Sequence, residues 1–186
     1  MAITATKLLT ADDLLRLDSE GIRGDLIRGV LHETTPSAGL EHSKIAAKLT
    51  FLLGLSIIPR SLGTLATLDL GVWLERDPDT VREPDIAYFS AARLPTDVRV
   101  TGYAEVPPDL VVEIVSPSDT RRAVRDKARM WLRYGVALVW VVQPDTRTVE
   151  VYEPGRAVVT HTGTDTLDGS EVLPGFTCPI SDIFDT

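Results

Sequence analysis

Hydrophobic residues between positions 41 and 57 recur at intervals of three and four residues. This spacing is typical of an amphipathic helix that packs one face on a core. The apolar stripe consists of Ile45, Ala46, Leu49, Leu52 and Leu53. The pattern therefore predicts a helix over residues 41–57 that lies against the interior of the protein.

A shorter helix and a hairpin are expected near the N-terminus. The hydroxyl of Thr10 can cap a helix whose first turn carries two aspartates, and this helix should end near Gly21 or Gly24. Residues 25–32 then read Asp-Leu-Ile-Arg-Gly-Val-Leu-His. The pair Arg28-Gly29 offers a tight turn between two short apolar runs, so this segment predicts a two-stranded hairpin.

Alternating apolar and polar residues predict strands in the middle of the chain. Residues 65–74 alternate in this way and predict one strand. A turn is expected at residues 77–80, and a second strand at residues 84–89. The next run, residues 109–116, is apolar on both faces, as in a central strand covered on both sides, except that Glu113 lies in its middle.

The last third of the chain predicts another helix and another hairpin. The helix should begin at Ser118 or Asp119 and run to Tyr134. Residues 137–142 and 148–152 alternate on either side of a turn. They predict a hairpin whose first strand is central in the sheet.

Taken in order, the elements are helix, hairpin, helix, a run of strands, helix and further strands, with an irregular tail from residue 173. This order predicts an α/β protein of the α+β kind, in which helices flank a mixed central β-sheet. The chain has no internal repeat, low-complexity run or long Gly/Ser linker, so we expect a single domain over residues 1–186. Within it, residues 1–24 form an N-terminal helical segment and residues 25–186 form the core.

The composition is that of an ordinary globular protein, with 186 residues of which 44% are hydrophobic and 25% charged. These proportions exclude collagen, coiled coils and wholesale disorder. The first 15 residues lack the apolar centre of a secretory signal, and the longest apolar run, residues 136–142, is far shorter than the ~20 residues of a membrane-spanning helix. The single cysteine, Cys178, excludes an internal disulfide. We therefore expect a cytoplasmic protein with no membrane partner.

Charge is unevenly distributed along the chain. The 19 basic and 27 acidic residues leave a formal charge of −8, so a nucleic-acid partner requires a local basic surface or a bound cation. Residues 119–134 carry six basic and two acidic residues, a local charge of +4. The six are Arg121, Arg122, Arg125, Lys127, Arg129 and Arg133. Such a run suits an enzyme that docks a phosphate backbone, and it is also typical of a plain solvated helix face.

Glu113 is the first candidate for chemistry. An ionised carboxylate among valines costs several kcal/mol to bury unless it is paired, hydrogen-bonded or bound to a cation. A positive group should therefore face it, either in a structural salt bridge or in a functional site. Asp85, which Pro84 places at the start of a strand, is a second carboxylate. Two carboxylates on adjacent strands form the oxygen-rich arrangement that holds Mg²⁺, so the pair is a candidate metal site.

Lys127 and His42 are further candidates. Lys127 lies at the border of the apolar face of the helix predicted before Tyr134, so its side chain points inward or across the rim. There it can neutralise charge on a phosphate or orient the attacking water, or simply extend past the core to solvent. His42, near the start of the helix over residues 41–57, is a candidate base or phosphate contact, or forms only a local hydrogen bond.

The order of these motifs resembles a known group of enzymes. Pro84-Asp85, then Glu113 in a valine-rich strand, then Lys127 on the next helix are similar to the PD-(D/E)XK nuclease superfamily. Within it, the chain most resembles a bacterial restriction endonuclease-like family that takes its lysine from this helix. The resemblance extends over residues 25–184 and includes Leu173-Pro-Gly-Phe.

The resemblance implies a fold and a reaction. The fold is a mixed central sheet flanked by helices, and the reaction is Mg²⁺-dependent hydrolysis of phosphodiester bonds, in which Mn²⁺ can substitute. It implies Asp85 and Glu113 as catalytic residues and metal ligands, with the backbone carbonyl of Ile114 as a third ligand. The superfamily's usual lysine position holds Val115 here, so the role passes to Lys127.

Asp25 is the remaining residue that the resemblance brings in. The family usually has a glutamate at this position, so a carboxylate remains on a side chain one methylene shorter. Asp25 therefore completes the acidic cluster as a catalytic residue, and its contact with the metal passes through water.

We therefore expect a metal-dependent endonuclease that hydrolyses DNA. Cutting both strands of a duplex needs two active sites, so a two-fold homodimer is expected. The first alternative is a nuclease fold with weak or no catalysis that serves as a nucleic-acid-binding or interaction module. The second is a metal-dependent phosphodiesterase for a substrate other than DNA, which the formal charge of −8 keeps open.

Overall fold

The computed structural model describes residues 8–33, 39–67 and 69–185. The chain divides into two compact units, each made of several sequence segments. The first unit consists of Met1–Pro36, Asp69–Glu83 and Val100–Val106, and the second of Ser37–Leu68, Pro84–Arg99 and Pro107–Thr186. The single domain over residues 1–186, with its boundary at residue 24, stays a prediction.

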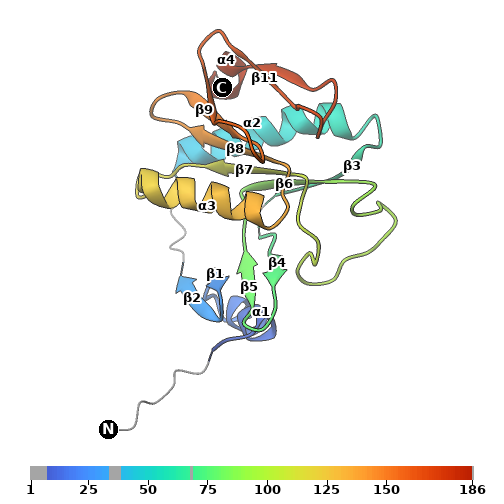
Figure 1. The fold of residues 1–186 in the computed structure, drawn as a ribbon, viewed down its shortest axis with the longest axis vertical. Coiled ribbons are helices and arrows are strands. Elements are labelled where there is room, and N and C mark those ends of the chain that lie inside the picture. The colour runs from blue at the N-terminus through green and yellow to red at the C-terminus, as the bar shows by residue number, and fades with distance from the viewer. Residues whose placement is uncertain (1–7, 34–38, 68, 186) are drawn as a thin grey trace. The chain divides into compact units, whose positions relative to one another are not determined.

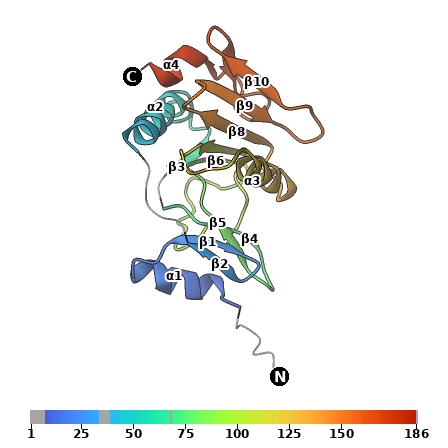
Figure 2. The same cartoon turned by 90° about the vertical axis from the view of Figure 1, so that its left-hand side faces the viewer.

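The first unit pairs one helix with a four-stranded antiparallel sheet. These elements are α1 (Ala11–Ser19), β1 (Gly24–Ile27), β2 (Val30–Glu33), β4 (Val72–Glu75) and β5 (Thr80–Arg82). The strand order is β2-β1-β5-β4, and Figure 2 shows α1 beside β1 and β2. The Thr10 hydroxyl accepts a hydrogen bond from the Asp13 backbone and the Asp13 side chain accepts one in return, so the predicted cap is present as a capping box.

The predicted hairpin is confirmed in the same unit. Arg28 and Gly29 have φ angles of 49° and 78°, the two positive values of the tight turn whose twist matches paired strands. The core of the unit is a small cluster of Ala11, Leu14, Leu26 and Val81. The helix and the sheet are therefore held together by apolar contacts.

The second unit is built around a six-stranded mixed sheet with the order β10-β9-β8-β7-β6-β3. The strands are β3 (Gly63–Thr67), β6 (Ile86–Ser90), β7 (Leu110–Ile114), β8 (Leu138–Gln143), β9 (Thr148–Tyr152) and β10 (Val159–Thr162). Strands β7 and β8 are parallel, and the other neighbouring pairs are antiparallel. This confirms the predicted mixed sheet and the central place of β7 and β8.

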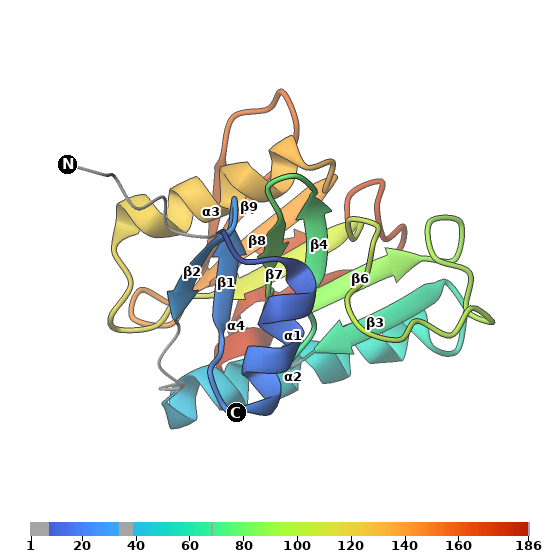
Figure 3. The same cartoon turned by 90° about the horizontal axis from the view of Figure 1, so that it is seen from below.

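Helices cover both faces of this sheet. Helix α2 (Leu40–Ile57) buries its apolar stripe against one face, and α3 (Arg121–Arg133) lies on the opposite face, as Figures 1 and 3 show. Strands β11 (Thr166–Asp168) and β12 (Thr177–Pro179) and helix α4 (Ile180–Phe184) add to the core on the α2 side. Because side chains alternate along a strand, Val112 and Ile114 of β7 face α2 and Glu113 faces α3.

The single strand predicted over residues 65–74 is wrong. The structure has β3 in the second unit and β4 in the first, separated by residues 68–71, of which Leu68 lies outside the described residues. Asp69 adopts a φ of 54°, and a Cβ on Gly71 would come within 2.1 Å of the Tyr103 ring. These two backbone features interrupt an extended strand before β4, and the alternating pattern does not reveal them. Strand β5 was also not predicted.

The third helix begins later than Ser118 or Asp119. Its N-cap is Thr120, whose hydroxyl accepts a hydrogen bond from the backbone N–H of Ala123. The Asp119 side chain instead accepts a hydrogen bond from the Ser116 backbone at 2.8 Å, which closes a turn before the helix. In the described part of the chain, no helix is long and apolar enough to cross a membrane.

Candidate active site

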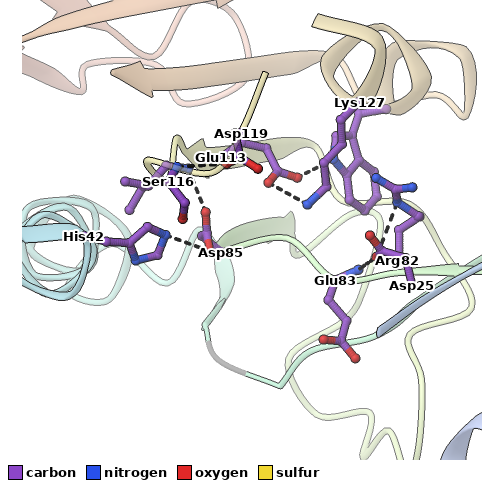
Figure 4. Close-up of polar contacts among 11 residues, drawn as sticks. Asp25, His42, Arg82, Glu83, Asp85, Glu113, Ser116, Asp119 and Lys127 are labelled. Atoms are coloured by element: carbon purple, nitrogen blue, oxygen red, sulfur yellow. Dashed lines mark hydrogen bonds and ion pairs between the residues drawn. The ribbon is translucent and has the colours of Figure 1, made fainter. Parts of the chain in front are cut away.

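Glu113 is held between two donors on α3. Its Oε2 lies 2.7 Å from Lys127 Nζ, and its Oε1 accepts a hydrogen bond from Trp131 Nε1 at 2.7 Å. Lys127 and Trp131 are four residues apart and therefore lie on one face of the helix. The Glu113 side chain is only 10% exposed. The positive group that the sequence requires beside Glu113 is thus Lys127 (Figure 4).

The surroundings of Glu113 raise its pKa to about 7. Burial is the main cause, because it disfavours the charged form. The negative charge of Asp85 adds to the rise, while the charge and hydrogen bond of Lys127 and the hydrogen bond of Trp131 oppose it. Glu113 therefore titrates near neutral pH, and a further cation at the site would favour its carboxylate form.

Asp85 lies directly before β6, across from Glu113. In the β6–β7 register Ile86 pairs with Val112, so one further step places Asp85 opposite Glu113. Asp85 Oδ2 accepts a hydrogen bond from the backbone N–H of Ile114 at 2.6 Å. This bond holds the Asp85 carboxylate beside the last residue of β7. Two neighbouring strands thus bring the two predicted carboxylates together.

His42 joins these residues from the first turn of α2. Its Nε2 lies 3.3 Å from Asp85 Oδ1, and Figure 4 shows the ring directed at that carboxylate. The hydrogen bond with Asp85 is the main cause of a raised His42 pKa; burial opposes it, and the charge of Asp85 and a backbone hydrogen bond with Ile114 add to it. The structure therefore brings His42 to Asp85 and Ile114, two of the predicted metal ligands.

Asp25 belongs to the first unit. Its Oδ1 accepts a hydrogen bond from the Glu83 backbone at 3.1 Å and lies 3.3 Å from Arg82 Nε. These contacts account for the position of its carboxylate within that unit (Figure 4). The role of Asp25 in an acidic cluster with Asp85 and Glu113 stays a prediction.

The donor set of the second unit fits a hard divalent cation. Mg²⁺ binds oxygen and is commonly held by one or two protein carboxylates while it keeps several waters. Asp85 and Glu113 provide these, and each carboxylate oxygen has lone pairs beyond the one used in its present hydrogen bond. Among the described residues, no group of three or more His, Cys, Asp and Glu side chains could hold a metal. A metal here would therefore depend on the two carboxylates, a backbone carbonyl and water.

Trp131 is the contact that sequence reasoning missed. It lies on the buried face of α3 and is fully buried. Its indole N–H nevertheless donates to Glu113 Oε1. The signal that could have found it is the four-residue spacing from Lys127, which directs both side chains at one partner. Val115, at the superfamily's usual lysine position, instead donates its backbone N–H to Val142 in the sheet.

Comparisons with known proteins show a family and a fold that this chain shares. The model of the Uma2 family, described as "Putative restriction endonuclease", matches residues 11–181. A solved structure from Anabaena variabilis, described as "a putative nuclease belonging to DUF820", has a TM-score of 0.82 at 22% sequence identity and covers 95% of this chain and 98% of that chain. That similarity shows a shared fold. The comparison with curated proteins gives no match.

The family match extends over most of the chain, including α2, β6, β7 and α3, which carry the candidate site of the second unit. The family description supports a nuclease function, and the family match and the shared fold agree with the PD-(D/E)XK resemblance. The chain therefore belongs to the Uma2 family of restriction endonuclease-like proteins.

Proposed function

We propose that the protein is a metal-dependent endonuclease that hydrolyses DNA phosphodiester bonds. The observation that carries the proposal is the pair of carboxylates on neighbouring strands, Asp85 and Glu113, with the ammonium group of Lys127 2.7 Å from the second of them. Divalent metal is the general cofactor of nucleases of this kind, and oxygen ligands of this type favour Mg²⁺, with Mn²⁺ as a substitute.

Asp85, Glu113 and the Ile114 carbonyl would hold the metal in this proposal. When bound, the ion would polarise the phosphoryl group and lower the pKa of a coordinated water. Asp85 is oriented for this role by the Ile114 N–H, and Glu113 by Lys127 and Trp131. These hydrogen bonds keep the acceptor oxygens in fixed places before substrate arrives, as efficient catalysis requires.

Lys127 would contact the substrate phosphate in addition to its hydrogen bond with Glu113. Its side chain is 24% exposed, so the ammonium group is partly accessible from outside. A positive charge at this place stabilises negative charge that develops on a phosphate during in-line displacement. His42 has a raised pKa and contacts Asp85 Oδ1. It would exchange a proton or contact a phosphate next to Asp85.

Asp25 and the oligomeric state complete the proposal. Asp25 would act on the metal through water, as the family resemblance implies. A homodimer would place one active site on each strand of a duplex.

The test is a cleavage assay with purified protein on supercoiled, linear and single-stranded DNA, with Mg²⁺, Mn²⁺ or EDTA. We expect cleavage with either metal and none with EDTA. Asp85→Asn and Lys127→Ala should both abolish it. Lys48→Ala is the matched control because it removes a lysine from α2 near Cys178, away from Glu113.

Two results would contradict the proposal. If folded wild-type protein binds DNA but cuts none of the three forms, the nucleic-acid-binding module becomes the better explanation. If it hydrolyses a small phosphodiester such as bis(p-nitrophenyl) phosphate with metal and leaves every DNA form intact, the substrate is not DNA.

A further inference from the structure

A polar pocket of about 350 Å³ opens beside the candidate site in the second unit. It lies between the first turns of α3 and the β8–β9 hairpin, and its wall includes Val115, Arg121, Arg125, Gln143 and Glu150. Val115 follows Ile114 directly at the end of β7. The pocket therefore adjoins the strand that carries Glu113, although none of the proposed catalytic residues lines it.

The acidic side chains of this pocket are already bound by protein groups. Glu150 Oε1 accepts a hydrogen bond from Gln143 Nε2 at 2.7 Å, and Oε2 accepts one from the Tyr152 hydroxyl at 2.6 Å. Asp119, also in the wall, accepts the backbone N–H of Ser116. Both carboxylates therefore accept hydrogen bonds from neighbouring residues of the protein.

The two arginines in the wall of this pocket, unlike its carboxylates, have donors that no protein group among the described residues uses. Arg121 and Arg125 are one helical turn apart on α3, and within the described part of the chain neither forms an ion pair. The one side-chain hydrogen bond of Arg125 runs from Nε to the Arg121 carbonyl at 3.3 Å, which leaves the outer donors of its guanidinium group available. By contrast, Arg122 is paired with Asp126 and points into solvent.

We propose that this pocket binds a backbone phosphate of the nucleic-acid strand next to the bond that is cut, through Arg121 and Arg125. Guanidinium groups match phosphate oxygens with paired donors and stay charged at every relevant pH. Of the six basic residues of this helix, Arg121 and Arg125 are the two that line the pocket. The inference rests on the proposed function in one respect, because it takes nucleic acid as the ligand.

The test measures DNA binding without cleavage. A fluorescent duplex is titrated with protein in EDTA at several salt concentrations, and the anisotropy gives Kd. Each lost phosphate contact lowers the slope of log K against log[salt] by about 0.9 and weakens binding about eightfold at ~0.1 M salt. The double variant Arg121→Ala/Arg125→Ala should therefore lose about 1.8 of slope and on the order of 50-fold in affinity.

Arg122→Ala/Arg133→Ala is the matched control, because it removes two positive charges from the same helix outside the pocket. Its slope should stay near that of the wild type, and circular dichroism should show both double variants folded. Equal losses in the two variants would mean that the general charge of the helix binds DNA, and would overturn the inference. No loss in either would do the same.

A second arm distinguishes the source of the phosphate. If a mononucleotide binds through Arg121 and Arg125 and duplex DNA does not bind, the pocket serves a free nucleotide and the strand assignment is wrong. The cleavage assay keeps the two proposals apart. DNA cutting with an unchanged Arg121→Ala/Arg125→Ala slope would reject the pocket alone, whereas arginine-dependent binding without cutting would reject the nuclease alone.

Discussion

Replacing Glu113 with glutamine should remove a pH dependence from the stability of the protein. Burial raises the pKa of Glu113 from 4.5 to about 7, so the folded protein holds this proton more tightly than the unfolded chain does. The stability that the protonated carboxyl contributes is therefore complete below about pH 4.5 and is lost as the pH rises through 7. Glutamine carries no such proton, so Glu113→Gln should lack this loss.

The magnitude follows from the two pKa values. A difference from 4.5 to about 7, at about 1.36 kcal/mol per pH unit, corresponds to about 3 kcal/mol. The Glu113 side chain is only 10% exposed, so solvent screening reduces this figure little. Relative to Glu113→Gln, the free energy of unfolding of the wild type should fall by that order between about pH 4.5 and about pH 8.

The assay is urea unfolding followed by far-UV circular dichroism at several pH values in EDTA, for wild type, Glu113→Gln and Glu41→Gln. Glu41 is an exposed glutamate on α2, so its replacement controls for the loss of one negative charge. A difference between wild type and Glu113→Gln that stays constant with pH would refute the reasoning. A difference that grows in favour of the wild type at high pH would mean that Lys127 and Trp131 outweigh burial.

Three further predictions concern single contacts. Trp131→Phe should cost about 2–3 kcal/mol in urea unfolding, because Glu113 Oε1 loses its buried donor, and a cost near zero would contradict the role of the indole N–H. Asp85→Asn should lower the His42 pKa in an NMR titration of the imidazole, because Asp85 is the main cause of its rise; an unchanged His42 pKa would show that the pair does not form in solution. Gly71→Ala should destabilise the protein by about 1–3 kcal/mol through its clash with Tyr103, measured as a lower Tm, and Tyr103→Ala in the same chain should relieve the clash.

Elements with strong periodicity could be predicted from the sequence. The apolar stripe of α2 and the apolar runs of β7 and β8 are buried in the core. Because the core requires apolar side chains at these positions, the sequence pattern indicates the elements directly. The tight turn at Arg28-Gly29 was predictable because few residue pairs suit it. The break before β4 was not, because Gly71 packs closely on Tyr103, a residue far along the chain.

The candidate site was predictable in part for the same reasons. A glutamate inside an apolar strand is costly, so Glu113 stood out and implied a positive partner. Trp131 did not stand out, because a tryptophan on an apolar helix face satisfies the pattern whether or not its N–H has a polar partner. Nor could charge alone select Arg121 and Arg125, since the β8–β9 hairpin that completes their pocket comes later in the chain.

The parallel pairing of β7 with β8 has a consequence for how such proteins are found. A parallel pair needs a crossover, here α3, which must traverse the face of the sheet on which Glu113 lies. Lys127, fourteen residues after Glu113 in the sequence, therefore reaches its carboxylate from this crossover helix. A sequence-motif search that requires the lysine two residues after the glutamate would not find this chain, because Val115 stands there. A search based on the position of the ammonium group relative to the carboxylate in space would find it, because in this chain the lysine reaches Glu113 from the crossover helix.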